Sequence, residues 1–312
     1  MKAIAIDDFG AAPTLHDLPV PQAAEGELLV RVEASSVNGF DMFVVSGMAK
    51  GMIEYRLPIV LGKDFAGTVE AAGPGVTGFA VGDPVFGVLM KMTLGDGTFT
   101  EHVAAAAMFV AKIPEGLPTQ VAGALGLAGA SAMAAIDAID PSNGETVLIS
   151  GATGGVGAFA LQLAKARGAT VIATATEDLQ DHVRALGADE TVDHTGDLAT
   201  AVKALRPGGV NAVVHAAGDG LALASLLVPG GRLASLLGFG ADQLTNPAIT
   251  ATSVIGMPTT ETLERLAGAV VRGELTVPIQ RTYSLLDAPR ALKDFAEGKR
   301  GKLAVTLERV TS

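Results

Sequence analysis

Residues 146–157 read Thr-Val-Leu-Ile-Ser-Gly-Ala-Thr-Gly-Gly-Val-Gly, and this stretch decides the fold. The aliphatic and β-branched run 146–150 is typical of a buried strand. The apolar periodicity from Val156 to Arg167 predicts a helix directly after the glycines. The stretch therefore predicts a strand, a sharp turn and a helix in immediate succession.

The glycines of this turn are spaced for binding a phosphate group. Gly151, Gly154 and Gly157 form G-x-x-G-x-x-G, which allows a tight turn and close approach of a ligand to the backbone. The N-terminus of the following helix offers free N–H groups and the positive end of its dipole. We expect a dinucleotide pyrophosphate here, bound by Gly151, Ala152, Thr153, Gly154, Gly155 and Val156.

Strands and helices alternate on the C-terminal side of this motif. Further strands are expected at 170–174, 212–215 and 232–237, and helices at 179–186, 198–205 and 221–227. Such alternation predicts a parallel, doubly wound sheet of the Rossmann type.

The first third of the chain has a different texture. Short strand-like runs at 28–32, 67–70, 84–88 and 100–103 are separated by Gly- and Pro-containing turns. After a predicted helix at 261–272 the chain returns to strand-like sequence and reaches a last strand at 303–307. We predict an α/β protein with a β-rich domain at 1–118 and 274–312 and a dinucleotide-binding domain at 119–273.

Composition narrows the classes of function. The 312 residues carry a net charge of −11, and the only basic cluster is the short segment 299–302, so nucleic acid and anionic membranes are not expected partners. The chain has no cysteine, which excludes disulfides, thiolate metal sites and a Cys nucleophile. The apolar stretch 121–139 is interrupted by glycine and carries Asp137, so we do not expect it to span a membrane. The N-terminus reads as a strand without an apolar signal-peptide core, so we expect no signal peptide. We expect a cytoplasmic protein.

The end of the second strand bears on the choice of cofactor. NAD-binding domains place an acidic residue there to bind the ribose 2′-hydroxyl, whereas this chain has Thr174, Ala175 and Thr176. These residues favour NADP(H), with the two hydroxyls as possible donors to the 2′-phosphate. Glu177 and Asp178 follow directly and count against this interpretation, so NAD remains an alternative.

Several motifs outside the glycine loop carry a family resemblance. Residues 37–41 (Val-Asn-Gly-Phe-Asp) resemble a V-N-x-x-D motif, and residues 58–67 with Gly82-Asp83 are similar to P-x-x-x-G-x-D-x-A-G…G-D. Gly97–Glu101, Gly230–Leu233 and Gly301–Leu303 also fit, in the same order along the chain. The chain is identified as a member of the zinc-free, zeta-crystallin-like quinone oxidoreductases within the medium-chain dehydrogenase/reductase superfamily.

The resemblance implies a GroES-like first domain joined to the Rossmann domain. It also implies pairing through an edge strand at 251–255, and we expect a homodimer because an exposed apolar edge is a liability unless it is paired. Beyond the glycine loop and residues 174–176, the cofactor-binding residues implied are Asn38, Asp41, Ser131, His194, Ala217, Leu237, Gly238 and Phe239.

Two departures from related sequences shape the expected chemistry. Zinc-dependent relatives place Cys at position 38 and Gly-His-Glu at positions 62–64, whereas this chain has Asn38 and Gly62-Lys63-Asp64. A catalytic zinc needs three protein ligands, so we expect no metal. Many quinone oxidoreductases also carry Tyr where this chain has Phe43, and Tyr55 is the nearest substitute.

Without a Lewis acid the substrate must itself be electrophilic. We therefore expect hydride transfer from NADPH to a quinone or an α,β-unsaturated carbonyl, with orientation and hydrogen bonds supplied by the protein. Asn38, Tyr55 and Lys63 are the candidate catalytic donors to the developing oxygen anion, with Asn38 the best placed.

Two other functions compete with this interpretation. A short-chain dehydrogenase would need Tyr-x-x-x-Lys, and neither Tyr55 nor Tyr283 is followed by the required lysine. An NADP(H)-binding protein with low turnover, acting structurally or as a redox sensor, stays open because the family's tyrosine is absent.

Overall fold

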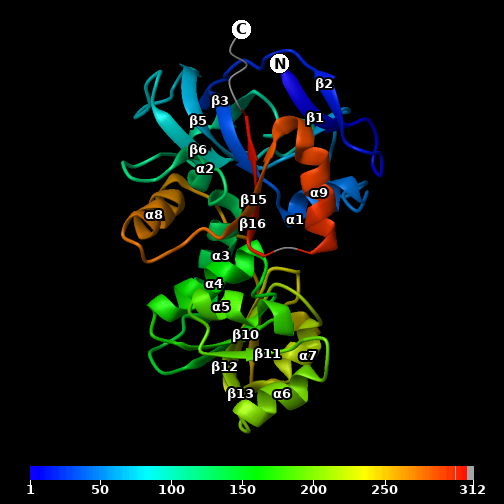
Figure 1. Ribbon diagram of the computed structural model, residues 1–312, viewed down its shortest axis with the longest axis vertical. Coiled ribbons are helices and arrows are strands. Elements are labelled where there is room, and N and C mark those ends of the chain that lie inside the picture. The colour runs from blue at the N-terminus through cyan, green and yellow to red at the C-terminus, as the bar shows by residue number, and fades with distance from the viewer. Residues whose placement is uncertain (299, 308–312) are drawn as a thin grey trace. The chain divides into compact units, whose positions relative to one another are not determined.

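The computed structural model describes residues 1–298 and 300–307, and this part of the chain divides into two compact units (Figure 1). The first unit holds residues 1–127, 258–272 and the segment from Ile279 onward. The second holds residues 128–257 and 273–278. The helices of the described residues include none with the length and apolar character needed to cross a bilayer.

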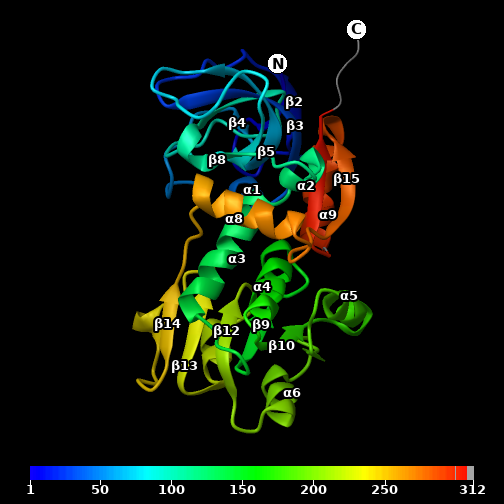
Figure 2. The same ribbon diagram turned by 90° about the vertical axis from the view of Figure 1, so that its left-hand side faces the viewer.

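The second unit is built on a six-stranded parallel sheet with the strand order β11-β10-β9-β12-β13-β14 (Figure 2). Its strands are β9 (Thr146–Ser150), β10 (Thr170–Thr174), β11 (Glu190–Val192), β12 (Val210–His215), β13 (Leu227–Ser235) and β14 (Thr250–Ser253). The predicted doubly wound sheet is confirmed. Because β10 and β12 flank β9 and the chain runs outward in opposite directions from it, the topological switch point lies between β9 and β12.

The helices of this unit alternate with the strands, as the sequence pattern predicts. They are α3 (Gly126–Ile139), α4 (Gly155–Ala166), α5 (Gln180–Ala185), α6 (Leu198–Leu205) and α7 (Gly220–Ala224), with short 3₁₀ turns η2 (Glu177–Leu179) and η3 (Ala241–Gln243). Strands β9, β10 and β12 are buried along almost their whole length, as expected for parallel strands covered on both faces.

The first unit is β-rich and contains two sheets. The larger has the order β15-β16-β3-β5-β6-β8, with β7 also paired to β3, and the smaller has the order β2-β1-β4. The strands are β1 (Lys2–Ile6), β2 (Thr14–Asp17), β3 (Glu27–Ser36), β4 (Ile59–Val60), β5 (Asp64–Ala72), β6 (Pro84–Val88), β7 (His102–Ala106), β8 (Val110–Lys112), β15 (Ile279–Ser284) and β16 (Lys302–Thr306). The helical elements are α1 (Gly39–Val45), η1 (Ala107–Phe109), α2 (Thr119–Ala122), α8 (Thr260–Val271), η4 (Leu285–Asp287) and α9 (Ala288–Glu297).

Apolar clusters hold this unit together, and two of them are large. One packs β3, β5 and β6 through residues such as Leu28, Phe65 and Val85. The other joins the start of the chain to its last described strand through residues such as Ile4 and Val305. The C-terminal strand is therefore part of the first unit, as the predicted return to strand-like sequence requires.

Several predicted boundaries differ from those of the structure. The apolar stretch 121–139 is broken between α2 and α3, where Gly123 approaches the backbone of Ala34 so closely that a Cβ atom would meet it at 2.9 Å. The strand predicted at 232–237 starts earlier and ends at Ser235, and the helix predicted at 221–227 ends at Ala224.

The predicted domain limits, 1–118 with 274–312 and 119–273, also differ from the observed division. Residues 119–127 and helix α8 group with the first unit. The Thr260 hydroxyl, at the start of α8, donates to the carbonyl oxygen of Val110 across 2.8 Å. This contact attaches the helix to strand β8, although the sequence places it beyond the Rossmann strands.

Candidate functional site

The glycine loop between β9 and α4 has the conformation that the sequence predicts. Gly151 has a φ of 80°, in the left-handed region, and its N–H donates to the Thr174 hydroxyl across 3.0 Å. A Cβ atom on Gly157 would lie 2.1 Å from the carbonyl oxygen of Gly151. Only glycine fits there, and helix α4 begins at Gly155 with Gly154 as its N-cap. The loop thus lies against the start of helix α4, whose first N–H groups can donate hydrogen bonds to an anion.

Four polar side chains stand at the ends of neighbouring Rossmann strands. Ser150, Thr174, His215 and Ser235 are the last residues of β9, β10, β12 and β13, and all four are buried. His215 is the register partner of both Ser150 and Ser235. This row of polar groups marks the carboxyl edge of the sheet, where ligands of open α/β sheets bind.

Two of these polar side chains also form hydrogen bonds with the loops that follow the strands. The Ser150 hydroxyl donates to the carbonyl oxygen of Ala217 across 2.6 Å, which links the loop after β12 to the end of β9. Thr174 is already engaged by Gly151, so its hydroxyl supports the glycine loop. Thr176 donates to the carboxylate of Asp178 across 2.7 Å.

The remaining predicted cofactor residues lie at different places in the fold. Ala217 and the segment Leu237–Phe239 follow β12 and β13, at the same edge as the glycine loop. Leu237 is 57% exposed, and Phe239 is buried. Ser131 lies on α3, and His194 is exposed just after β11. The cofactor role of these last two residues stays a prediction.

In the first unit a buried polar cluster surrounds Asp64, the first residue of β5. Its Oδ2 atom accepts hydrogen bonds from the Ser36 hydroxyl at 2.6 Å and the Asn38 amide at 2.9 Å. The Lys302 ammonium lies 3.3 Å from the same oxygen. The other oxygen, Oδ1, accepts the backbone N–H of Leu127 at 2.7 Å. Both oxygens of the carboxylate are therefore in use.

Asn38 is held on both sides of its amide. Its Nδ2 atom donates to Asp64 and, across 3.2 Å, to the carbonyl oxygen of Ser36. Its Oδ1 atom accepts from Lys302 across 2.7 Å. As a donor to a substrate, Asn38 would first have to give up one of these bonds. Its predicted catalytic and cofactor roles remain untested.

Lys302 is the residue of this cluster that sequence reasoning missed. The Gly301–Leu303 segment resembles a family motif, but the motif by itself does not assign the lysine to a site. The available signal is a lysine at the head of the apolar run Leu303-Ala304-Val305, because a lysine that becomes fully buried needs a partner. Its partners are 238 and 264 positions away in the chain.

Asp41, three residues after Asn38, closes the first turn of α1. Its carboxylate accepts the backbone N–H groups of Asn38 and Gly62, each across 2.8 Å. The side chain is 1% exposed, and burial raises its pKa to about 6. Asp41 thereby connects the Val37–Asp41 motif to the Gly62–Asp64 motif, whereas a cofactor role for it stays a prediction.

Lys63 points its ammonium toward an aromatic ring. The Nζ atom lies 4.7 Å from the centroid of the Phe40 ring, and the residue is 9% exposed. Among the described residues, the carboxylates that influence this nitrogen, Asp41 and Asp96, act on it as nearby charges without an ion pair. Burial lowers the pKa of Lys63, while the charges of Asp41 and Asp96 oppose that shift. Its donor hydrogens are thus not committed in the way that those of Asn38 are.

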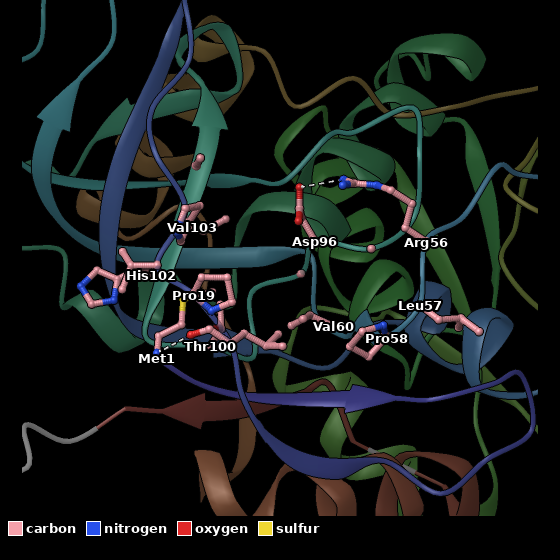
Figure 3. Close-up of a pocket in the computed structure, with 16 residues that line it drawn as sticks. Met1, Pro19, Arg56, Leu57, Pro58, Val60, Asp96, Thr100, His102 and Val103 are labelled. Carbon is pink, nitrogen blue, oxygen red and sulfur yellow. Dashed lines mark hydrogen bonds and ion pairs between the residues drawn. The ribbon is translucent and has the colours of Figure 1, made fainter.

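Tyr55 lies in an open pocket of about 640 Å³, formed by residues 51–56 with Thr93. Its ring packs edge-on against Phe9, with 4.9 Å between centroids. A second pocket, of about 260 Å³, lies on the same unit and is drawn in Figure 3. Its lining includes the Arg56–Asp96 ion pair but none of the three predicted catalytic residues, and we therefore assign it no part in the reaction.

The donor set around Asn38 does not resemble a zinc site. Positions 38, 63 and 64 supply an amide, an ammonium and a carboxylate already paired with Lys302. Within residues 1–298 and 300–307, no group of three or more His, Cys, Asp or Glu side chains is arranged to hold a metal ion.

Two protein-family profiles match the chain. Residues 24–115 match the alcohol dehydrogenase GroES-like domain, and residues 155–263 match a family described as zinc-binding dehydrogenase. The matches fall in the β-rich unit and mainly in the Rossmann unit, respectively.

Individual relatives agree with these profiles. The quinone oxidoreductase of Sus scrofa is 32% identical, with 98% of each chain covered. The chloroplast envelope quinone oxidoreductase homolog of Arabidopsis thaliana is 33% identical, over 70% of this chain and 68% of that protein. Among solved structures, the quinone oxidoreductase of Coxiella burnetii has a TM-score of 0.90 and 29% identity, with 99% of both chains covered. A mycobacterial protein solved in complex with NADPH has a TM-score of 0.85 and 30% identity, covering 98% of this chain and all of that one.

Proposed function

Because the chain belongs to the quinone oxidoreductase family of the medium-chain dehydrogenases/reductases, we propose that it transfers hydride from NADPH to quinones or α,β-unsaturated carbonyls without a metal ion. The family membership makes it an oxidoreductase. The choice of NADPH, the enone substrates and the independence from zinc are our proposals.

The glycine loop supports the binding of a nicotinamide dinucleotide. Its backbone leaves no room for a Cβ atom at Gly157, and the N-terminus of α4 opens onto the carboxyl edge of the sheet. The pyrophosphate would lie against residues 151–156. When bound, the nicotinamide supplies the hydride, and the protein supplies orientation and charge stabilisation.

Two observations support NADPH in particular. Strand β10 ends in Thr174 and continues with Ala175 and Thr176, so the acidic residue of NAD-binding domains is absent from that position. The mycobacterial relative, of similar length and 30% identity, was solved with NADPH. Residues 174–176 are therefore proposed to face the 2′-phosphate.

The observation that carries the metal-free proposal is that the Asp64 carboxylate is already bound by other groups of the protein. Its carboxylate accepts hydrogen bonds from Ser36, Asn38 and Leu127 and lies against the Lys302 ammonium. Its negative charge is balanced by Lys302, both of its oxygens accept hydrogen bonds, and Asn38 provides no thiolate. A substrate that delocalises incoming electrons by itself, such as a quinone or an enone, suits such a site.

The chain offers three polar groups to the oxygen that becomes negative. Lys63 is the strongest candidate. Among the described residues its amine forms no ion pair with a carboxylate, and burial lowers its pKa. Such an amine can donate a hydrogen bond or a proton. Tyr55 contributes a partly exposed phenol. Asn38 is better suited to holding Lys302 and Asp64 in place, since both ends of its amide are bonded.

The test is NADPH oxidation by purified protein against a quinone, an enone, a simple ketone and a simple alcohol, with and without a strong chelator. Activity on the quinone or enone that survives chelation supports the proposal. Robust oxidation of the alcohol, or activity that disappears with chelation and returns with zinc, contradicts it.

A second candidate function is NADP(H) binding with little turnover. It is favoured by the replacement of the family tyrosine by Phe43 and by the committed amide of Asn38. Tight NADPH binding without oxidation by any member of the substrate panel would select this alternative.

A further inference from the structure

Strands β12 and β13 end on a buried pair, His215 and Ser235. The two residues are register partners, and the Ser235 hydroxyl lies 3.0 Å from Nδ1 of His215. Both side chains are at most 3% exposed. The pair stands next to the switch point between β9 and β12, where the carboxyl ends of the strands open into the ligand crevice.

The surrounding donors decide where the protons of this pair lie. The Ser235 oxygen accepts the backbone N–H groups of Leu237 and Phe239, each across 3.1 Å. Since its acceptor positions are taken, its own hydrogen must point to Nδ1 of His215. Nδ1 is then unprotonated, and the proton on Nε2 is donated to the carbonyl oxygen of Gly218 across 3.0 Å. Each polar atom of the pair has its partner in this one arrangement.

The pair consequently ties together two loops from neighbouring strands. His215 holds the loop after β12 at Gly218, and Ser235 holds the loop after β13 at the N–H groups of Leu237 and Phe239. The ring of Phe239 stands edge-on to His215, with 6.2 Å between centroids and 80° between planes. A Cβ atom on Gly220 would meet the same ring at 2.5 Å. The second loop is therefore held by both hydrogen bonds and packing.

We propose that His215 and Ser235 are positioning residues for the nicotinamide dinucleotide, acting through the backbone of the loops at residues 216–218 and 236–239. This inference deepens the proposed function and rests on it. A dinucleotide lies across the switch point and contacts the backbone of loops on both sides. Loops that are already fixed bind with a smaller loss of conformational entropy.

The test is the dissociation constant of the dinucleotide, measured by fluorescence titration for the wild type, Ser235→Ala and Ser235→Thr. Ser235→Ala removes the partner of Nδ1 of His215 and of the Leu237 and Phe239 N–H groups, so we expect affinity to fall by about tenfold or more. Ser235→Thr keeps the hydroxyl and should restore most of that loss. The KM for a quinone at saturating cofactor should not change. Ser225→Ala is the matched control, because the Ser225 hydroxyl donates to the Ala222 carbonyl oxygen one turn back, within helix α7.

An unchanged dissociation constant in Ser235→Ala would overturn the inference. So would a Ser235→Thr protein that binds no better than Ser235→Ala. A measurement on the wild type covers the case in which the variants do not fold: a long-range ¹H–¹⁵N spectrum reports which imidazole nitrogen of His215 is protonated. A proton on Nε2 supports the arrangement described, and a proton on Nδ1 contradicts it.

These outcomes separate the inference from the proposed function. If the wild type prefers NADH, the NADPH proposal fails, and the same titrations with NADH still test the pair. If the wild type binds cofactor but reduces neither quinone nor enone, the proposed reaction fails while the loss of affinity in Ser235→Ala still supports the pair. A wild type that binds neither dinucleotide overturns both.

Discussion

The Nζ atom of Lys302 donates to the Oδ1 atom of Asn38 across 2.7 Å, although the two residues are 264 positions apart. The same ammonium lies 3.3 Å from Asp64, and all three side chains are buried. The last described strand is thereby bonded to the two motifs that zinc-dependent relatives use for ligands. Removing one partner of a buried pair costs far more than the pair contributes as a whole, because it leaves a charge without compensation.

The first prediction concerns this pair. Lys302→Met should lower the free energy of unfolding by about 3–5 kcal/mol, since Asp64 would be left charged in the interior. Adding Asp64→Asn should recover part of the loss. Urea unfolding checks both variants, with Lys293→Met as control, because that ion pair with Glu297 is exposed. A loss in Lys302→Met no larger than in the control would show that the pair is unimportant for stability.

The second prediction is a pH dependence that arises from Asp41. Burial raises its pKa from 3.8 to about 6 in the folded protein, so between these values the folded state binds more protons than the unfolded state. The contribution of Asp41 to stability therefore falls as the pH rises from about 4 to above 6, by an amount on the order of 1–3 kcal/mol.

Unfolding of the wild type and Asp41→Asn at several pH values tests this dependence. Asparagine cannot accept both N–H groups, so the variant should be less stable throughout, but the difference should shrink as the pH rises. Taking the difference between the two proteins cancels the titration of other carboxyl groups. A difference that stays constant from pH 4 to pH 7 would refute the raised pKa.

Much of the Rossmann unit could be predicted from the sequence, because the sequence signals that specify its elements are local. The glycine spacing, the apolar strands and the alternation of elements each lie within a few residues. The ends of β9, β10, β12 and β13 carry a readable signal too, since each apolar strand finishes on a polar residue. Their hydrogen bonds could not be predicted, because they depend on which strands are neighbours.

The site in the first unit was harder to predict because its partners are distant in sequence. Asn38, Asp64 and Lys302 meet only when β16 pairs with β3 and β3 pairs with β5. Motif comparison identified Asn38 as a donor, yet the fold uses its amide internally. The placement of α8 likewise depends on a contact with Val110 that no local pattern encodes.

The third prediction concerns cofactor choice. We expect NADPH to bind more tightly than NADH in a competition titration, because no acidic residue ends β10. Tighter NADH binding would instead indicate that Glu177 reaches the ribose. In that case Glu177→Gln should weaken NADH binding and leave NADPH binding unchanged.

The fourth prediction concerns assembly. Strand β14 is an edge of the Rossmann sheet, and Ile255, just beyond it, is 81% exposed. We propose that this edge pairs with a second copy in a homodimer, since the unpaired N–H and C=O groups of an edge strand invite strand pairing. Sedimentation at micromolar concentration should give the mass of two chains, and Ile255→Glu should shift it toward one. A wild type that sediments as a single chain would exclude the homodimer.

The last prediction is that Lys63 supports the chemistry. Its amine is buried over the Phe40 ring, and its pKa is lowered below 10.5, so it should act in its protonated form as a donor to the anionic oxygen of the reduced substrate. Lys63→Met should lower kcat for a quinone by about 100-fold, with little change in NADPH affinity. Wild-type kcat should fall as the pH rises through the lowered pKa, and the variant's residual rate should lack that step. Lys50→Met is the matched control, because Lys50 also lies over an aromatic ring, that of Phe9, but is largely exposed and paired with Asp8. Equal kcat in Lys63→Met and wild type would remove Lys63 from the mechanism and leave Tyr55 as the donor to test.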